Sequence, residues 1–328
     1  MTPPHGAAWR PSATFEVLRR RAVFINKIRT FFHTRGVLEV ETPILSRAAT
    51  TDVHLDSFET TFGGAVVAKE RLLYLHTSPE FFMKRLLAAG SGPIYQICKV
   101  FRNGEVGKVH NPEFTLLEWY RPGYNDRDLM LEMDELLHEV LGFSPAIRLS
   151  YAEAFEQILH VDPHTDPLEK IKSCVEKNAL SLISNNTEED RDFWLDLLFS
   201  HAVQPRLGHG QPVFLYDFPA SQAALARKRA GPPPVAERFE LFYNGVELAN
   251  GFHELCNADE QRARFDADVA KRRQLGLPIT AQDMRFIAAL DAGLPASAGV
   301  AVGLDRLFMV SEGIPSLAEV LSFDFSIV

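Results

Sequence analysis

The chain has 328 residues, 46% of them hydrophobic and 23% charged, and a formal net charge of −9 at pH 7. This composition supports a sizeable folded core, and the negative charge provides no general attraction for nucleic acid. Three cysteines without a CxxC pair argue against a disulfide framework or a structural zinc site.

The first predicted elements lie in the N-terminal third of the chain. Residues 1–13 are rich in Pro and Ala and are expected to form a flexible leader, without the apolar core of a signal peptide. Apolar residues at helical spacing predict a long amphipathic helix from Thr14 to Gly36. The segment "VLEVETPIL" reads as a strand that runs into Pro43.

A helix start and a hairpin follow. Ser78 and Pro79 are typical of a helix N-terminus, with Glu80 in the first turn. "IYQICKVFRNGE" and "PEFTLLEWYR" predict an antiparallel hairpin with a long polar loop, from Val100 to Tyr120.

The middle of the chain predicts a helix over residues 125–141 and then helices with loops, which we interpret as a helical insertion at about 150–210. "QPVFLYDFP" predicts a strand, and Asn244-Gly245 predicts a tight hairpin between two more strands. Helices are expected at 258–275 and 281–292. Hairpins with helices between them indicate an antiparallel sheet flanked by helices, in one domain spanning residues 14–328.

The segment "AGVAVGLDRL", residues 298–307, predicts a strand with one almost bare face. Gly299, Ala301 and Gly303 share that face, and valines occupy the other. Glycine weakens a strand and is typical of places where a ligand or another backbone comes close. We interpret the bare face as the floor of a ligand site, beside the guanidinium of Arg306. Tight packing against a helix is the alternative.

The predicted hairpin carries groups that suit a nucleotide. Arg102, Lys108 and His110 supply positive or protonatable groups, and Phe114 supplies an aromatic plate. A solvated hairpin tip with a core phenylalanine is the alternative. No GxxxxGK[ST] or GxGxxG loop occurs, so a phosphate would have to be bound in another way.

Four carboxylates, Glu80, Glu118, Glu247 and Glu254, lie in apolar or strand contexts, where a charge needs a partner. They suit magnesium or ammonium groups. Solvated strand faces are the simpler explanation for each. His253 has no second histidine at HExxH spacing, so we expect a hydrogen-bonding residue rather than a zinc ligand.

Three segments in this order resemble the signature motifs of class II aminoacyl-tRNA synthetases: "RGVLEVETPIL", "FRNGEVGKVHNPEFTLLEWY" and "GVAVGLDRL". "TSPEFFMKRLL", "HNPEFT" and "NGVELANGFHEL" are similar to the lysyl branch of that class. The resemblance implies an α+β class II core, with a six-stranded antiparallel sheet flanked by helices, that forms a homodimer through motif 1. It also implies that ATP and Mg²⁺ are used to activate a lysine as an aminoacyl-adenylate, in the cytoplasm.

The resemblance further implies residues for each ligand. Arg102 would bind the α-phosphate and the substrate carboxylate, while Phe114 and Arg306 would enclose the adenine. The implied ATP-binding residues are Arg102, Asn103, Gly104, Asn111, Phe114, Glu247, Leu248, Gly303 and Arg306. The implied residues for the lysine-like substrate are Ser78, Pro79, Glu80, Glu118, Tyr120, Glu254 and Ala301. Glu247 and Asn250 would bind Mg²⁺, and Arg102, Glu247 and Arg306 would be catalytic.

Three departures separate this chain from a lysyl-tRNA synthetase. Only 13 residues precede the predicted helix of motif 1, which is expected to leave no room for an N-terminal anticodon-binding domain. Ala301 replaces the middle glycine of motif 3, and Gly104 stands where motif 2 has an acidic residue, with Glu105 one place later.

A short core with Ala301 is similar to the synthetase-like enzymes that attach lysine, preferably (R)-β-lysine, to a lysine ε-amino group of elongation factor P. We therefore expect an ATP-dependent ligase with elongation factor P as partner and no direct tRNA substrate. A truncated lysyl-tRNA synthetase, a synthetase-like regulatory subunit and an asparagine-synthetase-like ligase are the alternatives.

Overall fold

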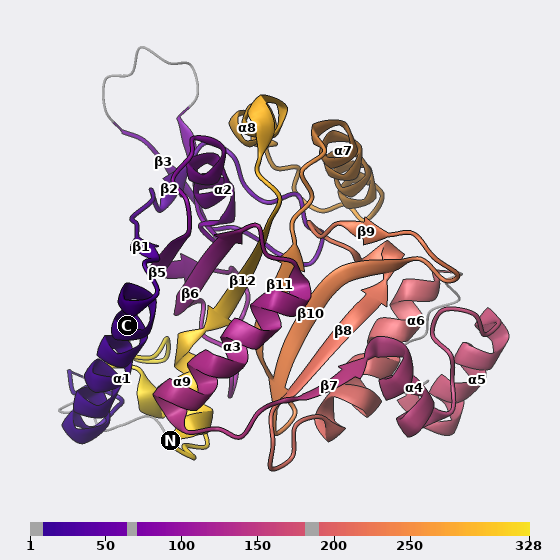
Figure 1. The fold of residues 1–328 in the computed structure, drawn as a ribbon, viewed down its shortest axis with the longest axis horizontal. Helices are drawn as coiled ribbons and strands as arrows, with labels where there is room; N and C mark the ends of the chain where they lie inside the picture. The colour runs from indigo at the N-terminus through magenta and orange to yellow at the C-terminus, as the bar shows by residue number, and fades with distance from the viewer. Residues whose placement is uncertain (1–8, 64–70, 181–189) are drawn as a thin grey trace. The chain divides into compact units, whose positions relative to one another are not determined.

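The computed structural model describes residues 9–63, 71–180 and 190–328, and these divide into two compact units (Figure 1). Unit 1 comprises residues 1–122, 256–296 and 301–328, and unit 2 comprises residues 123–255 and 297–300. Residues 1–8 of the predicted leader and residues 181–189 of the predicted insertion lie outside the described residues.

Unit 1 contains both helices and strands. Its elements are α1 (Phe15–Thr34), β1 (Leu38–Glu39), β2 (Leu45–Ser46), β3 (Glu59–Thr61), β4 (Leu72–Leu75), α2 (Glu80–Ala88), β5 (Ile94–Phe101), β6 (Glu113–Pro122), α7 (Ala258–Gln274), α8 (Met284–Gly293), α9 (Leu304–Ser311) and a 3₁₀ turn at Leu317–Val320.

The long N-terminal helix forms as predicted. The hydroxyl of Thr14 accepts a hydrogen bond from the Val17 amide at 3.3 Å and caps α1. The buried face of α1 includes Phe32, whose ring stacks on Tyr95 with centroids 4.5 Å apart and meets Trp119 at 5.2 Å. These contacts fix α1 to β5 and β6, since offset aromatic pairs add to the burial of apolar area.

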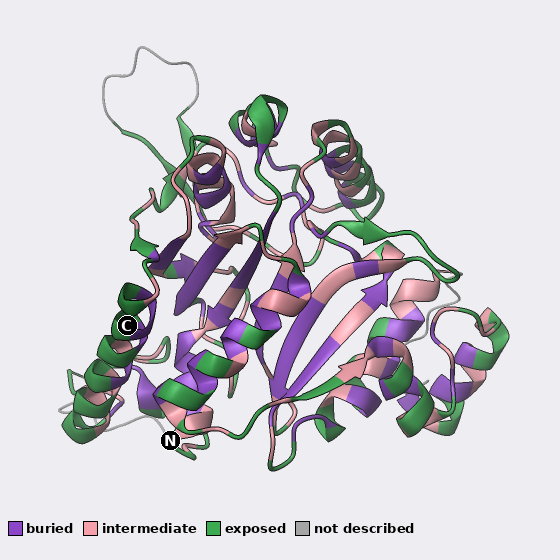
Figure 2. Cartoon of the chain, viewed as in Figure 1, coloured by how far each residue is buried: buried purple, intermediate pink, exposed green. Residues whose placement is uncertain are grey.

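The predicted antiparallel hairpin is also confirmed. β5 and β6 pair from Ile94 opposite Tyr120 to Phe101 opposite Glu113. Figure 2 shows both strands largely buried. Opposite residues share a face of the sheet, so Glu118 and its partner Gln96 lie together, as do Phe114 and Val100.

Unit 2 contains α3 (Asp126–Leu141), β7 (Ile147–Ser150), α4 (Tyr151–Leu159), α5 (Leu168–Lys177), α6 (Arg191–Leu198), a π-helical turn at Phe199–Val203, 3₁₀ turns at Gln204–Arg206 and Ala220–Gln222, β8 (Val213–Pro219), β9 (Lys228–Arg229), β10 (Val235–Tyr243) and β11 (Val246–His253). The helices α4 to α6 lie within the region predicted to be helical, and their apolar residues form a hydrophobic cluster with β8.

The hairpin of β10 and β11 turns at Asn244 and Gly245, both with positive φ, as the dipeptide predicted. The pairing shifts by one residue along the hairpin: Phe242 is opposite Glu247, but Leu241 is opposite Ala249. Leu248 is therefore the extra residue of a β-bulge. This bulge decides which polar side chains of β11 share a face.

The predicted six-stranded antiparallel sheet was wrong in size and in direction. The large sheet has nine strands: β1, β5 and β6 of unit 1, β7 to β11 of unit 2, and β12 (Ser297–Gly303), whose residues are divided between the units. Two pairings are parallel, β1 with β5 and β7 with β8. Strands β2 to β4 and helix α2 lie between β1 and β5 along the chain, and α4 to α6 lie between β7 and β8. Such long crossovers permit parallel pairing.

The strand predicted over "VLEVETPIL" is also shorter than expected. Only Leu38–Glu39 and Leu45–Ser46 pair, in two different sheets, with Thr42 and Pro43 between them. Proline has no N–H to donate, so the pairing is interrupted there.

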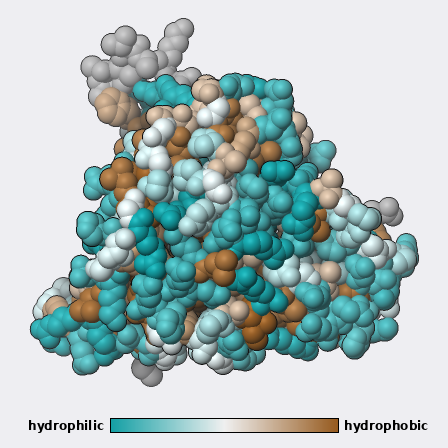
Figure 3. All heavy atoms as spheres, viewed as in Figure 1, coloured by the Kyte–Doolittle hydropathy of each residue, from teal (hydrophilic) through white to brown (hydrophobic). Residues whose placement is uncertain are grey.

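No helix in the described ranges is long and apolar enough to cross a membrane. The face of the molecule drawn in Figure 3 is mostly hydrophilic, and its hydrophobic residues lie in small separate groups.

Candidate active site

A buried carboxyl group occupies the centre of the predicted substrate residues in unit 1. Glu118 on β6 is 2% exposed, and its two oxygens accept hydrogen bonds from Ser78 Oγ at 2.7 Å and Tyr120 OH at 2.5 Å. Burial and, to a smaller extent, the nearby charge of Glu80 raise the pKa of Glu118 to about 7. The two hydroxyls hold the carboxyl in one orientation, as a specific receptor for a cation requires.

The start of α2 brings a second carboxylate to the same place. Ser78 Oγ also accepts a hydrogen bond from the Glu80 amide at 3.0 Å, so one hydroxyl orients the helix start and Glu118 together. Glu80 pairs with Lys84, one turn later, at 2.5 Å. Lys84 is 1% exposed and its charge lowers the pKa of Glu118. Glu80 thus has a cationic partner within the protein, and Glu118 is oriented by the hydroxyls of Ser78 and Tyr120.

The raised pKa of Glu118 predicts pH-dependent substrate affinity. Below about pH 7 the empty site holds a proton on Glu118 that must leave before the carboxylate can bind an ammonium group. Affinity for a ligand that carries an ammonium group should therefore rise as the pH increases from 6 to 8, by up to about tenfold per unit below the pKa. Calorimetric titration at pH 6 and pH 8 measures this change in affinity, and a Glu118→Gln variant is expected to show none. The same dependence of affinity on pH in both proteins would contradict the prediction.

Arg102 and Phe114 lie together at the open end of the β5–β6 hairpin. The Arg102 guanidinium carbon is 5.1 Å from the Phe114 ring centroid. Its Nε is buried and makes no hydrogen bond within the described protein. A permanently charged donor without an acceptor is suited to an incoming phosphate or carboxylate.

The backbone conformation explains why glycine, and not an acidic residue, stands at position 104 of motif 2. Gly104 has φ of +84°, a left-handed conformation that favours glycine. Glu105 is the residue that faces Arg102, with Glu105 Oε1 3.8 Å from Arg102 Nη1. Asn103 is exposed, and its amide donates to the Asp56 carbonyl at 2.8 Å.

Asn111 and Arg306 both make hydrogen bonds that involve the loop between β5 and β6. Asn111 donates to the Glu113 carbonyl at 2.7 Å and accepts from the Phe325 amide at 3.0 Å, so its side chain shapes the loop. Arg306 Nε donates to the Val109 carbonyl at 2.9 Å. The guanidinium is thereby held against the loop that precedes Phe114.

The predicted bare strand is confirmed as β12. Val300 and Val302 are 2% and 0% exposed, whereas Ala301 and Gly303 on the other face are partly exposed. The three atoms nearest to a Cβ added at Gly303 all belong to the Arg306 side chain, the closest at 3.8 Å, which is ordinary contact. The absence of a side chain at 303 therefore keeps space open beside Arg306.

The magnesium ligands predicted in unit 2 lie on one face because of the β-bulge. Glu247 and Asn250 are opposite Phe242 and Glu240, which are two residues apart on β10. In a regular strand, positions 247 and 250 would point to opposite faces. Leu248, the extra residue, is 2% exposed. Carboxylate and amide oxygens are the donors that Mg²⁺ prefers, so this residue set fits that ion.

Glu240 joins this group. It is 6% exposed, and burial raises its pKa to about 7; the Arg238 guanidinium opposes the rise and the charge of Glu247 adds to it. Arg238 also donates to Asn250 Oδ1 at 3.3 Å. Glu254, at the end of β11, is 2% exposed, and its amide donates to the Ser297 carbonyl at 2.9 Å.

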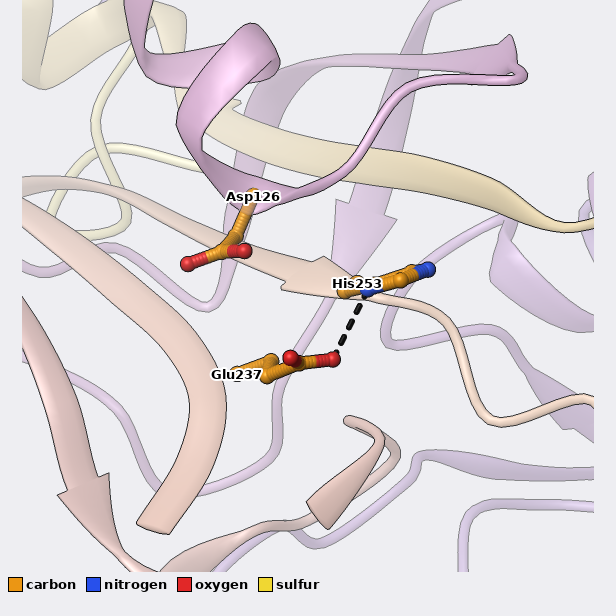
Figure 4. Close-up of side chains that lie close together, drawn as sticks. All are labelled: Asp126, Glu237 and His253. Atoms are coloured by element: carbon orange, nitrogen blue, oxygen red, sulfur yellow. Dashed lines mark ion pairs between the residues drawn. The ribbon is translucent and has the colours of Figure 1, made fainter. Parts of the chain in front are cut away.

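A second polar cluster in unit 2 brings Asp126, Glu237 and His253 together (Figure 4). His253 Nδ1 is 2.8 Å from Glu237 Oε2, and one donor atom of each residue lies within 4.8 Å of the others. Three arginines surround the carboxylates: Arg127 at 3.4 Å from Asp126, and Arg227 and Arg229 at 3.6 and 3.8 Å from Glu237. They supply the positive charge that a metal would bring, so we interpret the cluster as an ion-pair network.

Sequence reasoning did not identify Lys84, Gln96 or Glu240. It also missed Asp305 on α9, whose carboxylate accepts a hydrogen bond from the Thr115 amide at 2.7 Å. The Glu80-to-Lys84 spacing of four on a helix could have indicated the first pair. Gln96 follows from the hairpin register. Glu240 depends on a bulge that has no signature in the sequence, and Asp305 depends on contacts between segments far apart in the chain.

The family of the chain can now be stated. Residues 7–325 match the model of tRNA synthetases class II (D, K and N), so the chain belongs to this family. It is 53% identical over 321 residues to a protein of Vibrio vulnificus (strain YJ016), covering 98% of this chain and 99% of the relative. It is 53% identical to a protein of Edwardsiella ictaluri and 52% identical to one of Salmonella paratyphi A, each over 317 residues and 97% of both chains. All three relatives are named elongation factor P–(R)-β-lysine ligase, which confirms the predicted resemblance.

Proposed function

We propose that this chain uses ATP to activate (R)-β-lysine, or lysine, and transfers it to a lysine ε-amino group of elongation factor P. The observation that carries the proposal is the buried Glu118 carboxyl between Ser78 and Tyr120, which suits the ammonium of a lysine-like substrate. The names of the relatives support the acceptor and the β-isomer, and do not favour tRNA charging.

The chemistry needs no protein nucleophile. A carboxylate oxygen of the amino acid attacks the α-phosphorus of ATP and pyrophosphate leaves; the acceptor amine then attacks the acyl carbon, and AMP leaves with its electron pair. Positioning and charge stabilisation dominate such chemistry, and Arg102 and Arg306 would contribute to both. Burial raises the pKa of Cys98 to about 12, so its thiol stays protonated at neutral pH.

Mg²⁺ would be held by oxygens of Glu247 and Asn250, with Glu240 as a further candidate. When bound it would neutralise charge on the phosphates, as divalent cations do in other phosphoryl-transfer sites. Phe114 and Arg306 would enclose the adenine, and Glu254 and Ala301 would adjoin the substrate.

An acceptor assay tests the proposal directly. Purified enzyme, ATP, Mg²⁺ and labelled β-lysine or α-lysine are offered either unmodified elongation factor P or total tRNA. Label on elongation factor P, released by protease but resistant to mild base, is the expected result. Label on tRNA alone would overturn the proposal in favour of a truncated lysyl-tRNA synthetase.

Ala301 predicts the isomer preference. Its methyl group lies on the partly exposed face of β12, where the class has glycine in the middle of motif 3. Ala301→Gly should relax the preference toward α-lysine by roughly 5- to 150-fold, since one methyl group in a pocket is worth about 1–3 kcal/mol. The ratio of kcat/KM for the two isomers measures this, and an unchanged ratio would contradict it.

We also propose a cytoplasmic homodimer that pairs through α1 and the strand that follows it. α1 leaves Phe15 and Val23 exposed at 70% and 59%, as an uncovered interface would. Sedimentation at micromolar concentration should give the dimer mass, and a monomer would contradict this part of the proposal.

A further inference from the structure

One buried carboxylate joins three segments of unit 1 that are far apart in the sequence. Asp305, the second residue of α9, is 1% exposed. Its Oδ2 accepts a hydrogen bond from the Thr115 amide on β6 at 2.7 Å, and its Oδ1 accepts one from the Arg21 guanidinium on α1. The same Arg21 nitrogen donates to Thr115 Oγ1 at 3.0 Å. Helix α1, strand β6 and helix α9 thus meet at one charged group.

This junction lies one residue from each of the two side chains proposed to enclose the adenine. Thr115 directly follows Phe114, and Asp305 directly precedes Arg306. Asp305 therefore ties the backbone beside the aromatic plate to the backbone beside the guanidinium. The Arg306 Nε bond to the Val109 carbonyl makes a second tie between α9 and the hairpin.

The enclosure of a flat base depends on that spacing. Stacking requires ring planes at van der Waals separation, and a displacement of about 1 Å in a binding residue can reduce activity by about a hundredfold. The pair is shielded from solvent, because the side chain of Asp305 is 2% exposed and that of Arg21 is 14% exposed. Water therefore cannot easily replace either partner.

We propose that Asp305 is a positioning residue for ATP, holding Phe114 and Arg306 at the separation that an adenine ring requires. Its carboxylate oxygens contact Thr115 and Arg21, so it acts through its neighbours and not on the substrate itself. The inference rests on the proposed adenine-binding roles of Phe114 and Arg306. It implies in addition that Arg21, on the N-terminal helix, contributes to ATP affinity through the same contact.

Asp305→Asn tests the inference, because the amide keeps the shape and one acceptor oxygen but loses the charge that binds Arg21. Binding of Mg·ATP and of lysine is measured separately by calorimetry, alongside thermal unfolding. We expect the Kd for ATP to rise at least tenfold while the Kd for lysine stays within twofold. The matched control is Asp268→Asn on α7, which removes a carboxylate bonded to Thr51 Oγ1 at 2.8 Å and should leave both values unchanged.

Unchanged ATP affinity in Asp305→Asn would overturn the inference, as would a parallel loss of ATP and lysine binding, which a purely structural role predicts. If Asp305→Asn does not fold, Arg21→Ala decides by the same criterion, since it removes the nitrogen that donates to both Asp305 and Thr115. Phe114→Ala and Arg306→Ala separate this result from the proposed function: if both retain full ATP affinity, the adenine assignment itself is wrong.

Discussion

Replacing Glu118 by glutamine is expected to reduce kcat/KM for adenylate formation from a lysine-like substrate by about 10²- to 10³-fold. Glu118 is 2% exposed and fixed by Ser78 and Tyr120, so an ammonium group bound there is largely removed from water. Losing one partner of a desolvated, hydrogen-bonded charge pair costs about 2–5 kcal/mol, and each 1.4 kcal/mol is a factor of ten. Glutamine keeps the size of the side chain, so the effect should not come from a cavity.

Amino-acid-dependent exchange of pyrophosphate into ATP measures this step without the acceptor. The KM for lysine should rise while the KM for ATP stays within about twofold. Glu113→Gln is a matched control on the same strand, because Glu113 is half exposed and 3.4 Å from Lys99; a surface pair of this kind is worth little. A Glu118→Gln enzyme within threefold of the wild type would show that the ammonium binds elsewhere.

Local patterns predicted the elements of this fold well. The cap at Thr14, the Ser78-Pro79 helix start, the β5–β6 hairpin and the turn at Asn244-Gly245 each depend on residues close in sequence, and each is confirmed. The strand with a bare face is confirmed for the same reason, because alternation along one strand needs no distant partner.

The number of strands in the sheet and their relative directions could not be predicted from the sequence. Pairing of β1 with β5 and of β7 with β8 depends on how intervening helices return the chain to the sheet, and two- to four-residue strands have too little pattern to show it. The bulge at Leu248 is a second case. Without it, alternation would put Glu247 and Asn250 on opposite faces, so the sequence pattern alone argues against a pair that the hairpin brings to one face.

The site shows the same division between local and distant effects. Residue types in motif 2 indicated an anion site at Arg102 and Phe114, which do lie together, with 5.1 Å from the Arg102 guanidinium carbon to the Phe114 ring centroid. Which acidic residue faces Arg102 could not be decided, since it depends on the positive φ at Gly104 that turns the loop and brings in Glu105. The contacts of Asp305 join segments that are far apart in the sequence: Arg21 and Thr115, which are hydrogen-bonded to each other, are more than 90 residues apart. No short sequence pattern predicts such contacts.

Replacing Arg102 by alanine is expected to lower adenylate formation by about 10³-fold, the largest effect that we predict for a single cation in unit 1. Its guanidinium carries a buried Nε without a hydrogen-bond partner among the described residues, and 3.8 Å from Glu105 is too long for a strong bond to compete. Loss of one preorganised donor to a developing oxyanion costs about 10²- to 10³-fold, and a guanidinium can offer two donors at once.

Arg102→Lys separates charge from geometry in this prediction. Lysine keeps the positive charge but presents a single ammonium, which cannot make two parallel bonds to a phosphate or carboxylate. It should therefore recover no more than about a tenth of the lost rate, and the defect should appear in kcat as well as in the KM for ATP. Lys99→Ala, which removes a half-exposed cation from β5, the strand that ends directly before Arg102, should change neither value more than twofold. Full activity in Arg102→Lys would mean that a general positive field at the hairpin, rather than a directed pair of hydrogen bonds, stabilises the reacting phosphate.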